Sequence, residues 1–403
     1  MQIVIAGAGI GGLAAALALH ADGHEVRVIE SVPEIKPLGV GINLLPQAVK
    51  VLDELGLAEA LLSRGIATRE LSYFNRFGQR IWTEPRGLFG GFQAPQISLS
   101  RGALQMTLLQ HALERLGAER IVTGRKLMRF ETRGDVALAV FSAADQVVET
   151  EGDILVCADG IHSMARRQMY PEEGAPIYSG RVLWRSTSYA EPFLSGATMI
   201  MAGYEAQKFV AYPIEPAGAG RQRINWIAEL RVPVMREKED WYRAGDIADF
   251  LPAFADWKFD WLDVPQLIGD AERIYEYPMV DRDPVEAWTS GSVTLVGDAA
   301  HAMYPIGSNG ASQAILDAGA LVRALRAHTN PRTALQVYEA ERLPATAAIV
   351  RANRHNGPEH CMQLAHERAP EGFNLLEDVF APGELQAIAD HYKSLTGMKR
   401  KAS

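Results

Sequence analysis

The sequence contains few cysteines and no long apolar run. Of its 403 residues only Cys157 and Cys361 are cysteines, which leaves no disulfide framework and no cysteine-ligated metal cluster. No uninterrupted apolar run reaches the roughly 20 residues that a helix needs to span a bilayer. The first strand begins at Gln2, without a charged segment and cleavage site before it. We therefore expect a reduced, cytoplasmic protein that neither binds a metal nor enters a membrane.

An excess of basic residues is also missing. The 49 acidic residues outnumber the 40 basic ones and give a formal net charge of −9, which disfavours a nucleic-acid-binding surface. The one basic run, residues 399–401, lies in what is most simply a solvated tail. The hydrophobic share of 48% is ordinary for a globular protein with a large core. A chain of this length suits two or three domains.

The chain begins and ends with α/β patterning and has a β-rich middle. Residues 2–30 read as a β-branched strand, a small-residue helix and a second strand. Short alternating strands with polar turns dominate from about residue 175 to 274. Five of the seven tryptophans fall in that middle part: Trp184, Trp226, Trp241, Trp257 and Trp261. The pattern predicts a nucleotide-type domain that is interrupted by a mostly β insert with a broad apolar face.

A glycine-rich turn joins the first strand to the first helix. Gly7 permits the tight turn, Gly9 leaves room for a pyrophosphate, and Gly12 lets the helix approach the strand. The helix N-terminus adds free N–H groups and a positive dipole end. Glu30 follows the second strand, where a carboxylate can bind ribose hydroxyls, so NAD or FAD fits better than NADP. A glycine-rich turn without a ligand is the alternative, and these residues alone do not separate NAD from FAD.

Two later stretches complete a set of three motifs. They are DILVCADGIHSMARR at 153–167 and VTLVGDAAHAMYPIGSNGA at 293–311. With the first turn they resemble the signatures of the aromatic-ring flavoprotein monooxygenases of the p-hydroxybenzoate hydroxylase type. The chain has no CxxC and no second GxGxxG, in contrast to the disulfide-type flavin reductases. The resemblance extends over nearly the whole chain, and within the family it is greatest to the 5-methylphenazine-1-carboxylate monooxygenase branch.

The resemblance implies a specific fold and domain organisation. We expect an α/β protein, α+β overall, with a Rossmann-like FAD-binding domain that is interrupted by a mostly antiparallel β substrate domain. The implied parts are 1–174 and 275–370 for FAD, 175–274 for the substrate, and 371–403 for a C-terminal helix and tail.

The resemblance also implies which residues bind FAD. Asp298 would accept a hydrogen bond from the ribityl chain, and the helix that starts near Gly310 would direct its N-terminus at the edge of the ring that becomes negative on reduction. His301 is mainly structural in the family motif. The implied FAD-binding residues are Gly7, Gly9, Gly12, Glu30, Gly41, Arg101, Gln105, Asp159, Arg166, Asp298, Gly307 and Gly310. As alternatives, Asp298 is only a helix cap, and Arg166 is an exposed arginine beside an Asx turn.

The implied reaction is hydroxylation of a small aromatic or heteroaromatic ring. NADH or NADPH docks transiently and reduces FAD, O2 adds to the reduced flavin at C4a, and the hydroperoxide transfers one oxygen to the substrate. The cofactor carries this chemistry, so the protein needs an apolar pocket with a few polar anchors. We expect a phenazine-like or carboxylate-bearing substrate and a monomer or homodimer. Salicylate-type or hydroxypyridine-type substrates, an FAD oxidase without hydroxylation, and a pyridine-nucleotide dehydrogenase are the alternatives.

The predicted pocket combines strands of the insert with the turn of the third motif. Tyr212, Tyr304 and Pro305 are expected to orient the reactants rather than to act as acid or base. Arg185 would pair with a substrate carboxylate or, alternatively, with a carboxylate in the sheet. Strand alternation places Trp184 and Arg185 on opposite faces, so only one of them can point into the pocket. The predicted substrate-binding residues are Trp184, Arg185, Phe209, Tyr212, Tyr304 and Ile306.

Overall fold

Six strands form a mainly parallel sheet around the first strand of the chain. The structure is a computed structural model that describes residues 1–37, 39–144, 146–235 and 243–395. The strand order is β20-β21-β12-β1-β2-β8, and every neighbouring pair is parallel except β20 and β21. The strands are β1 (Gln2–Ala6), β2 (Glu25–Ile29), β8 (Ile121–Val122), β12 (Ile154–Cys157), β20 (Thr289–Ser290) and β21 (Val293–Leu295). β12 and β21 are buried throughout, as in parallel sheets that are covered on both faces.

Small side chains allow the first helix, α1, to lie deep in this part of the molecule. Three consecutive alanines of α1, residues 14–16, are buried, and the helix packs against α4 and α8. A Cβ on Gly12 would come within 2.0 Å of the Gly7 carbonyl oxygen, so this approach requires glycine. The helices around the sheet are α1 (Ile10–Ala21), α2 (Pro46–Glu54), α3 (Ala58–Leu62), α4 (Arg101–Leu116), α5 (Met164–Met169), α7 (Asp298–His301) and α8 (Gly310–Ala327). The predicted α/β class and Rossmann-like start are confirmed.

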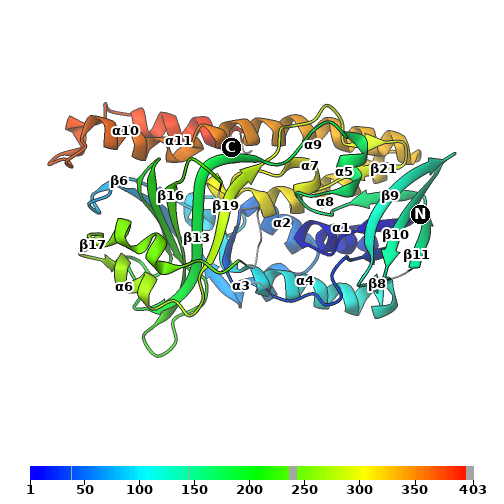
Figure 1. The fold of residues 1–403 in the computed structure, drawn as a ribbon, viewed down its shortest axis with the longest axis horizontal. Helices are drawn as coiled ribbons and strands as arrows, with labels where there is room; N and C mark the ends of the chain where they lie inside the picture. Colours follow the sequence, from blue (N-terminus) through cyan, green and yellow to red (C-terminus); the bar gives the residue numbers. More distant parts are fainter. Residues whose placement is uncertain (38, 145, 236–242, 396–403) are drawn as a thin grey trace.

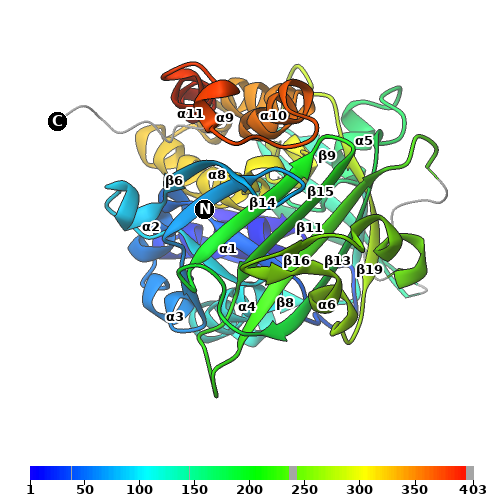
Figure 2. The ribbon, with the colours of Figure 1, turned by 90° about the vertical axis from the view of Figure 1, so that its left-hand side faces the viewer.

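A second, larger sheet stands beside this layer (Figures 1 and 2). Its order is β19-β13-β16-β15-β14-β5-β6, and only β14 and β5 pair in parallel. The strands are β5 (Glu70–Phe74), β6 (Arg80–Pro85), β13 (Ile177–Ala190), β14 (Thr198–Tyr204), β15 (Gln207–Pro213), β16 (Gln222–Arg231) and β19 (Tyr275–Asp281). The sheet thus takes in β5, β6 and β19 from outside residues 175–274, and the domain boundaries drawn from the sequence stay a prediction.

One face of the large sheet carries an aromatic core. Trp184, Phe209 and Trp226 lie on this face with Phe250 and Phe254, and all five side chains are buried. The Trp184 and Phe250 rings stack with centroids 4.9 Å apart. Helix α6 (Val264–Gly269) packs against β13, next to the short strands β17 (Lys258–Phe259) and β18 (Leu262–Asp263). The opposite face of the sheet is therefore the one that can line a cavity, although α10 covers part of it.

Long helices from the end of the chain run along one side of the molecule, orange to red in Figure 1. They are α9 (Pro331–Arg354), α10 (His360–Arg368) and α11 (Glu384–Leu395). α9 packs on α8, and α10 packs on β14 and β6. Among the described helices none is long and apolar enough to cross a membrane. The predicted basic tail, 399–401, lies outside the described residues.

Two three-stranded sheets complete the fold. The first consists of β3 (Gly41–Leu44), β7 (Ile97–Ser100) and β4 (Gly65–Ala67), and the second of β9 (Lys126–Arg133), β10 (Val136–Ala143) and β11 (Gln146–Gly152). A Cβ on Gly41 would come within 2.6 Å of the Asn225 side chain. The first small sheet therefore approaches the large sheet closely at this glycine.

Candidate active site

A cavity of about 350 Å³ lies between the parallel sheet and the large sheet. The N-terminus of α1, the second motif and the third motif line one side, through residues that include Gly9, Gly160 and Asp298. Strands β13 to β16 line the other side, through Arg185 and Tyr212 among others. The three sequence motifs therefore meet at one cavity, although they are far apart in the chain.

The first glycine turn is open where a pyrophosphate would lie. A Cβ on Gly9 would meet nothing within 4 Å, and Gly9 caps α1 without any side-chain hydrogen bond. The Ala8 backbone is held by two side chains, because its N–H donates to Glu30 Oε2 at 2.7 Å and its carbonyl accepts from Gln105 Nε2 at 3.3 Å. Free helical N–H groups at a rigid, uncapped turn suit an anion. Glu30 and Gln105 thus brace the turn and lie outside the lining of the cavity.

The third motif presents a second uncapped helix to the same cavity. α8 begins at Gly310, which lines the cavity, and Asn309 gives it no side-chain cap. Asp298 is exposed and also lines the cavity. Gly307 does not line the cavity. Its φ is +67°, and a Cβ there would come within 2.3 Å of the Tyr392 hydroxyl. Gly307 is therefore required by the turn and by its contact with α11.

A buried cluster of charged side chains fixes the third motif through hydrogen bonds. His301 Nε2 and Asp317 Oδ2 are 2.6 Å apart, and the Gly297 N–H donates to the same oxygen at 3.0 Å. Arg342 Nε donates to Asp317 Oδ1 at 2.8 Å. Burial alone would raise the pKa of Asp317, but His301 and Arg342 bring it below its ordinary value. His301 is buried and lies outside the cavity lining.

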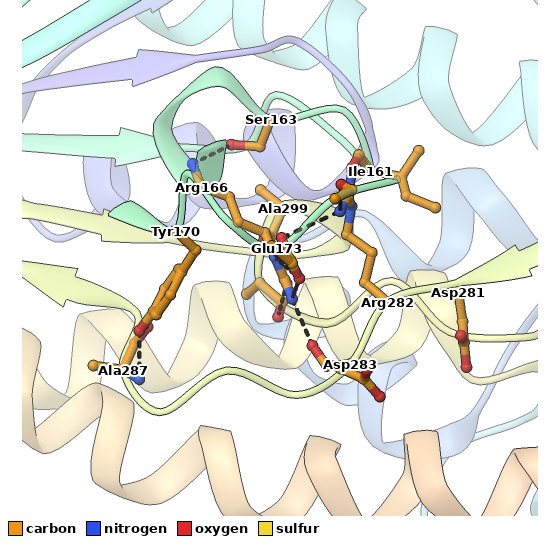
Figure 3. Close-up of polar contacts among 12 residues, drawn as sticks. Ile161, Ser163, Arg166, Tyr170, Glu173, Asp281, Arg282, Asp283, Ala287 and Ala299 are labelled. Carbon is orange, nitrogen blue, oxygen red and sulfur yellow. Dashed lines mark hydrogen bonds and ion pairs between the residues drawn. The ribbon is translucent and has the colours of Figure 1, made fainter. Parts of the chain in front are cut away.

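The structure does not support a direct contact between Arg166 and a cofactor (Figure 3). Arg166 is 1% exposed, in contrast to the alternative of an exposed arginine. All five of its N–H donors meet protein oxygens: Nε and Nη2 bind Glu173, Nη1 binds the carbonyls of Ala299 and Ala300, and Nη2 also binds the carbonyl of Asp283. Arg166 therefore ties the second motif to α7.

Asp159 caps the turn of the second motif. Its Oδ2 accepts from the Met164 N–H at 2.8 Å, whereas its buried Oδ1 has no hydrogen-bond partner among the described residues. Burial raises the pKa of this carboxyl group. The neighbouring Gly160 lines the cavity, with open space where a Cβ would lie. An orphaned acceptor next to a glycine is typical of a site that a ligand completes.

Strand register decides which insert residues reach the cavity. Arg185 pairs with Ile227, which pairs with Val210, and all three line the cavity. Trp184 and Phe209 lie on the opposite face, in the aromatic core, so the prediction that they line the pocket is wrong. Successive strand side chains alternate between the two faces. Phe209 and Tyr212, three residues apart, could therefore not both face the cavity.

The residues of the turn around Pro305 also differ in whether they line the cavity. Pro305 and Ile306 line the cavity, whereas Tyr304 is not among the lining residues and hydrogen-bonds to Asp281. Burial, with a smaller effect of Asp281, raises the pKa of Tyr304 to about 12. Tyr304 therefore does not line the cavity in this structure, and its role in orienting the reactants stays a prediction.

The family model described as an FAD binding domain matches residues 1–353. The chain belongs to the FAD-dependent aromatic hydroxylases. A phenazine 1,6-dicarboxylic acid hydroxylase, PhzS, of Lysobacter antibioticus is 48% identical over 88% of this chain and 89% of its own length. A 3-amino-4-hydroxybenzoate 2-monooxygenase of Streptomyces cremeus is 30% identical over 89% of this chain and 87% of its own length.

Solved structures agree with this assignment. HpxO of Klebsiella pneumoniae, in a complex with FAD and uric acid, matches with a TM-score of 0.73 and 25% identity over 98% of this chain and 93% of its own. The hydroxylase uses FAD, takes NAD(P)H as reductant and O2 as co-substrate, and acts on an aromatic compound. The predicted cofactors and the predicted reaction class are confirmed.

Arg185 and Tyr212 are two polar groups on the mostly apolar wall that the large sheet gives to the hydroxylase cavity. No described residue makes a hydrogen bond or ion pair with the Arg185 guanidinium, and its buried Nε is unsatisfied. Burial lowers the pKa of Arg185 below its ordinary value. Burial also raises the pKa of Tyr212, which is 3% exposed, to about 12, so this phenol stays neutral. The predicted alternative, an ion pair of Arg185 within the sheet, is not found among the described residues.

Three charged residues of the cavity wall are absent from the sequence prediction. Lys208 Nζ lies 2.8 Å from Glu229 Oε2 and 2.6 Å from Glu359 Oε2, and all three side chains line the cavity. Lys208 and Tyr212 are four residues apart on one strand, so their side chains face the same side of the sheet. A charged residue on that side of an apolar strand could have indicated the polar part of the cavity wall. Glu359 comes from the corner between α9 and α10, and nothing in the local sequence marks it.

Proposed function

We propose that this hydroxylase acts on an aromatic carboxylate of the phenazine type, and that Arg185 binds the carboxylate. The observation that carries the proposal is the unpartnered guanidinium in the cavity wall. A partly buried cation without a counter-ion is unfavourable until an anion joins it. Arginine also offers a planar fork that matches a carboxylate. The compounds in the names of two relatives, phenazine 1,6-dicarboxylic acid and 3-amino-4-hydroxybenzoate, also carry a carboxylate.

The rest of the wall favours a flat, apolar ring system. Met199, Met201 and Val210 line the cavity on the side of Arg185, together with Leu183 and Ile227. Methionine adapts to irregular ligand shapes and makes favourable contacts with aromatic rings. Tyr212 adds a neutral hydroxyl group at one end of this surface. Such a lining supports a fused-ring substrate, with only a few polar positions to orient it.

FAD, when bound, supplies the oxygen-activating chemistry, and the chain binds and orients it. We assign the pyrophosphate to the N-terminus of α1 at Gly9, the adenosine ribose to Glu30 and the ribityl chain to Asp298. The uncapped N-terminus of α8, which begins at Gly310, is suited to the negative charge of the reduced ring. The orphaned oxygen of Asp159 and the open backbone at Gly160 support a ligand contact there as well. Arg101 and Gly41 line the same cavity.

The remaining proposals concern the state of the enzyme. We propose a monomer or homodimer in the cytoplasm. Support for a reducing compartment comes from the two cysteines, which are both free and buried.

The proposal is tested with pairs of ligands that differ only in charge. Phenazine-1-carboxylate and phenazine-1-carboxamide, and an equivalent pair of hydroxybenzoate type, are given to the holoenzyme. The measurements are ligand-stimulated NAD(P)H oxidation and mass detection of the oxygenated product. We expect stimulation and product with the phenazine carboxylate and at least tenfold lower kcat/KM with its amide. Equal turnover of acid and amide would refute the role of Arg185, and hydrogen peroxide without an oxygenated product would refute hydroxylation of these rings.

A further inference from the structure

The wall that carries Arg185 has a second polar position one row further along the strands. In the register of the large sheet, Arg185, Ile227 and Val210 form one row, and Leu183, Glu229 and Lys208 form the next. Arg185 and Lys208 lie two strands apart, so their Cα atoms are separated by roughly 12 Å, given the usual strand spacing and rise. Both side chains line the cavity. A ligand of several fused rings can therefore meet both positions at once.

The second position is not a free cation. Lys208 is held between Glu229 and Glu359 at 2.8 and 2.6 Å. Glu229 uses its other oxygen for Arg181 at 3.5 Å, and Arg181 in turn binds the half-exposed Glu205 at 2.9 Å. The ammonium is thus already neutralised, and the carboxylates keep the pKa of Lys208 above its ordinary value although burial opposes this.

Glu359 has an unused acceptor in this cluster. Its Oε2 binds Lys208, and no described residue donates to its Oε1. The side chain is 5% exposed and lines the cavity. Burial raises the pKa of Glu359, although Lys208 opposes the shift. A carboxylate oxygen without a protein partner, in a cavity wall, gains most from a hydrogen-bond donor and least from another anion.

We propose that Glu359 determines substrate specificity, by accepting a hydrogen bond from a hydroxyl or amino group at the end of the substrate opposite to the carboxylate held by Arg185. The inference rests on the proposed function and extends it. The cavity accepts one carboxylate and disfavours two, since a second would face Glu229 and Glu359 across an ammonium that they already neutralise. This hydroxylase should therefore prefer a monocarboxylate to a dicarboxylate. The name of the relative from Lysobacter antibioticus, by contrast, specifies a phenazine dicarboxylic acid.

The test compares three ligands of one ring system. They are phenazine-1-carboxylate, its 6-hydroxy derivative and phenazine-1,6-dicarboxylate, titrated calorimetrically into the holoenzyme without NAD(P)H. We expect the hydroxy acid to bind at least tenfold more tightly than the unsubstituted acid, and the dicarboxylate to bind most weakly. Binding of the dicarboxylate as tightly as the hydroxy acid would overturn the inference, and this ranking needs no variant.

Glu359→Gln should change the order in which the enzyme prefers the three ligands. A residue with a purely structural role would not produce such a change. The amide keeps the size but removes the charge, so the Kd of the dicarboxylate should improve relative to that of the hydroxy acid by at least tenfold. Glu205→Gln is the matched control, because Glu205 belongs to the same ion cluster but does not line the cavity. We expect it to leave the ranking unchanged. Equal weakening of all three ligands by Glu359→Gln would also overturn the inference.

The two proposals fail in different ways. If acid and amide bind equally to the wild-type enzyme, the role of Arg185 and the proposed function are wrong. If the acid is preferred but the hydroxyl group brings no gain, only the role of Glu359 is wrong.

Discussion

Replacing Arg185 with methionine should weaken substrate binding without weakening the fold. The guanidinium has no partner among the described residues and lies in a cavity wall that already contains Met199 and Met201. A hydrogen-bonded charge pair that is lost from a partly buried site costs about 2–3 kcal/mol. That corresponds to about 30- to 150-fold in kcat/KM for an aromatic carboxylate. Since an unpaired buried charge opposes folding, the melting temperature should stay the same or rise.

The assay measures both quantities on one preparation. Steady-state NAD(P)H oxidation gives kcat/KM for the phenazine carboxylate and for its amide, and a thermal melt gives stability. Arg231→Gln is the control, since Arg231 is an exposed arginine of the same sheet. The acid should lose its advantage over the amide in Arg185→Met and keep it in the control. If Arg185→Met lowers the activity toward acid and amide equally, or lowers the melting temperature by several degrees, the assignment of an anion site is incorrect.

Three further changes probe the cofactor side of the cavity. Asp298→Ala should reduce retention of FAD after gel filtration while leaving the fold intact, and an unchanged flavin-to-protein absorbance ratio would remove Asp298 from the site. Gly307→Ala should destabilise the chain by at least about 1 kcal/mol, because a φ of +67° is unfavourable for alanine and Tyr392 occupies the space; an unchanged denaturant midpoint would contradict this. Asp317→Asn should cost about 3–5 kcal/mol near neutral pH. The folded-state pKa of Asp317 lies below its ordinary 3.8, so its carboxylate stabilises the wild type above that pH and loses this effect as the pH falls further. The difference in melting temperature between wild type and Asp317→Asn should therefore narrow only in strong acid, and a difference that narrows already between pH 7 and pH 5 would refute this assignment.

That the motifs meet at one cavity could be predicted because each motif is local. Gly9 and Asp298 each sit at a strand-to-helix turn, and Gly310 begins helix α8, so chain geometry alone brings backbone N–H groups to a ligand. All three line the cavity. The role of Arg166 was harder to predict, because its partners include the carbonyls of residues 299 and 300, whose positions depend on the tertiary fold.

The substrate half could be predicted only up to a choice between two faces. Alternation correctly places Trp184 and Arg185 on opposite faces, but it does not say which face meets the cavity. The aromatic residues were the attractive choice, and they form the core on the other side instead. Glu359 reaches the cavity from a corner that follows the long helix α9, so no pattern of short range could reveal it.

The contact between Gly307 and Tyr392 has a consequence for the order in which the enzyme is made. The Tyr392 hydroxyl accepts from Asn309 Nδ2 at 2.8 Å and donates to Asn353 Oδ1 at 2.8 Å, so it holds the turn before α8 in place. Tyr392 lies in α11, more than 80 residues after this turn in the chain. The first glycine turn is synthesised early, but the turn before α8 cannot be locked until α11 has left the ribosome and folded against it. The two turns that face the cavity therefore reach their final form at different stages of synthesis.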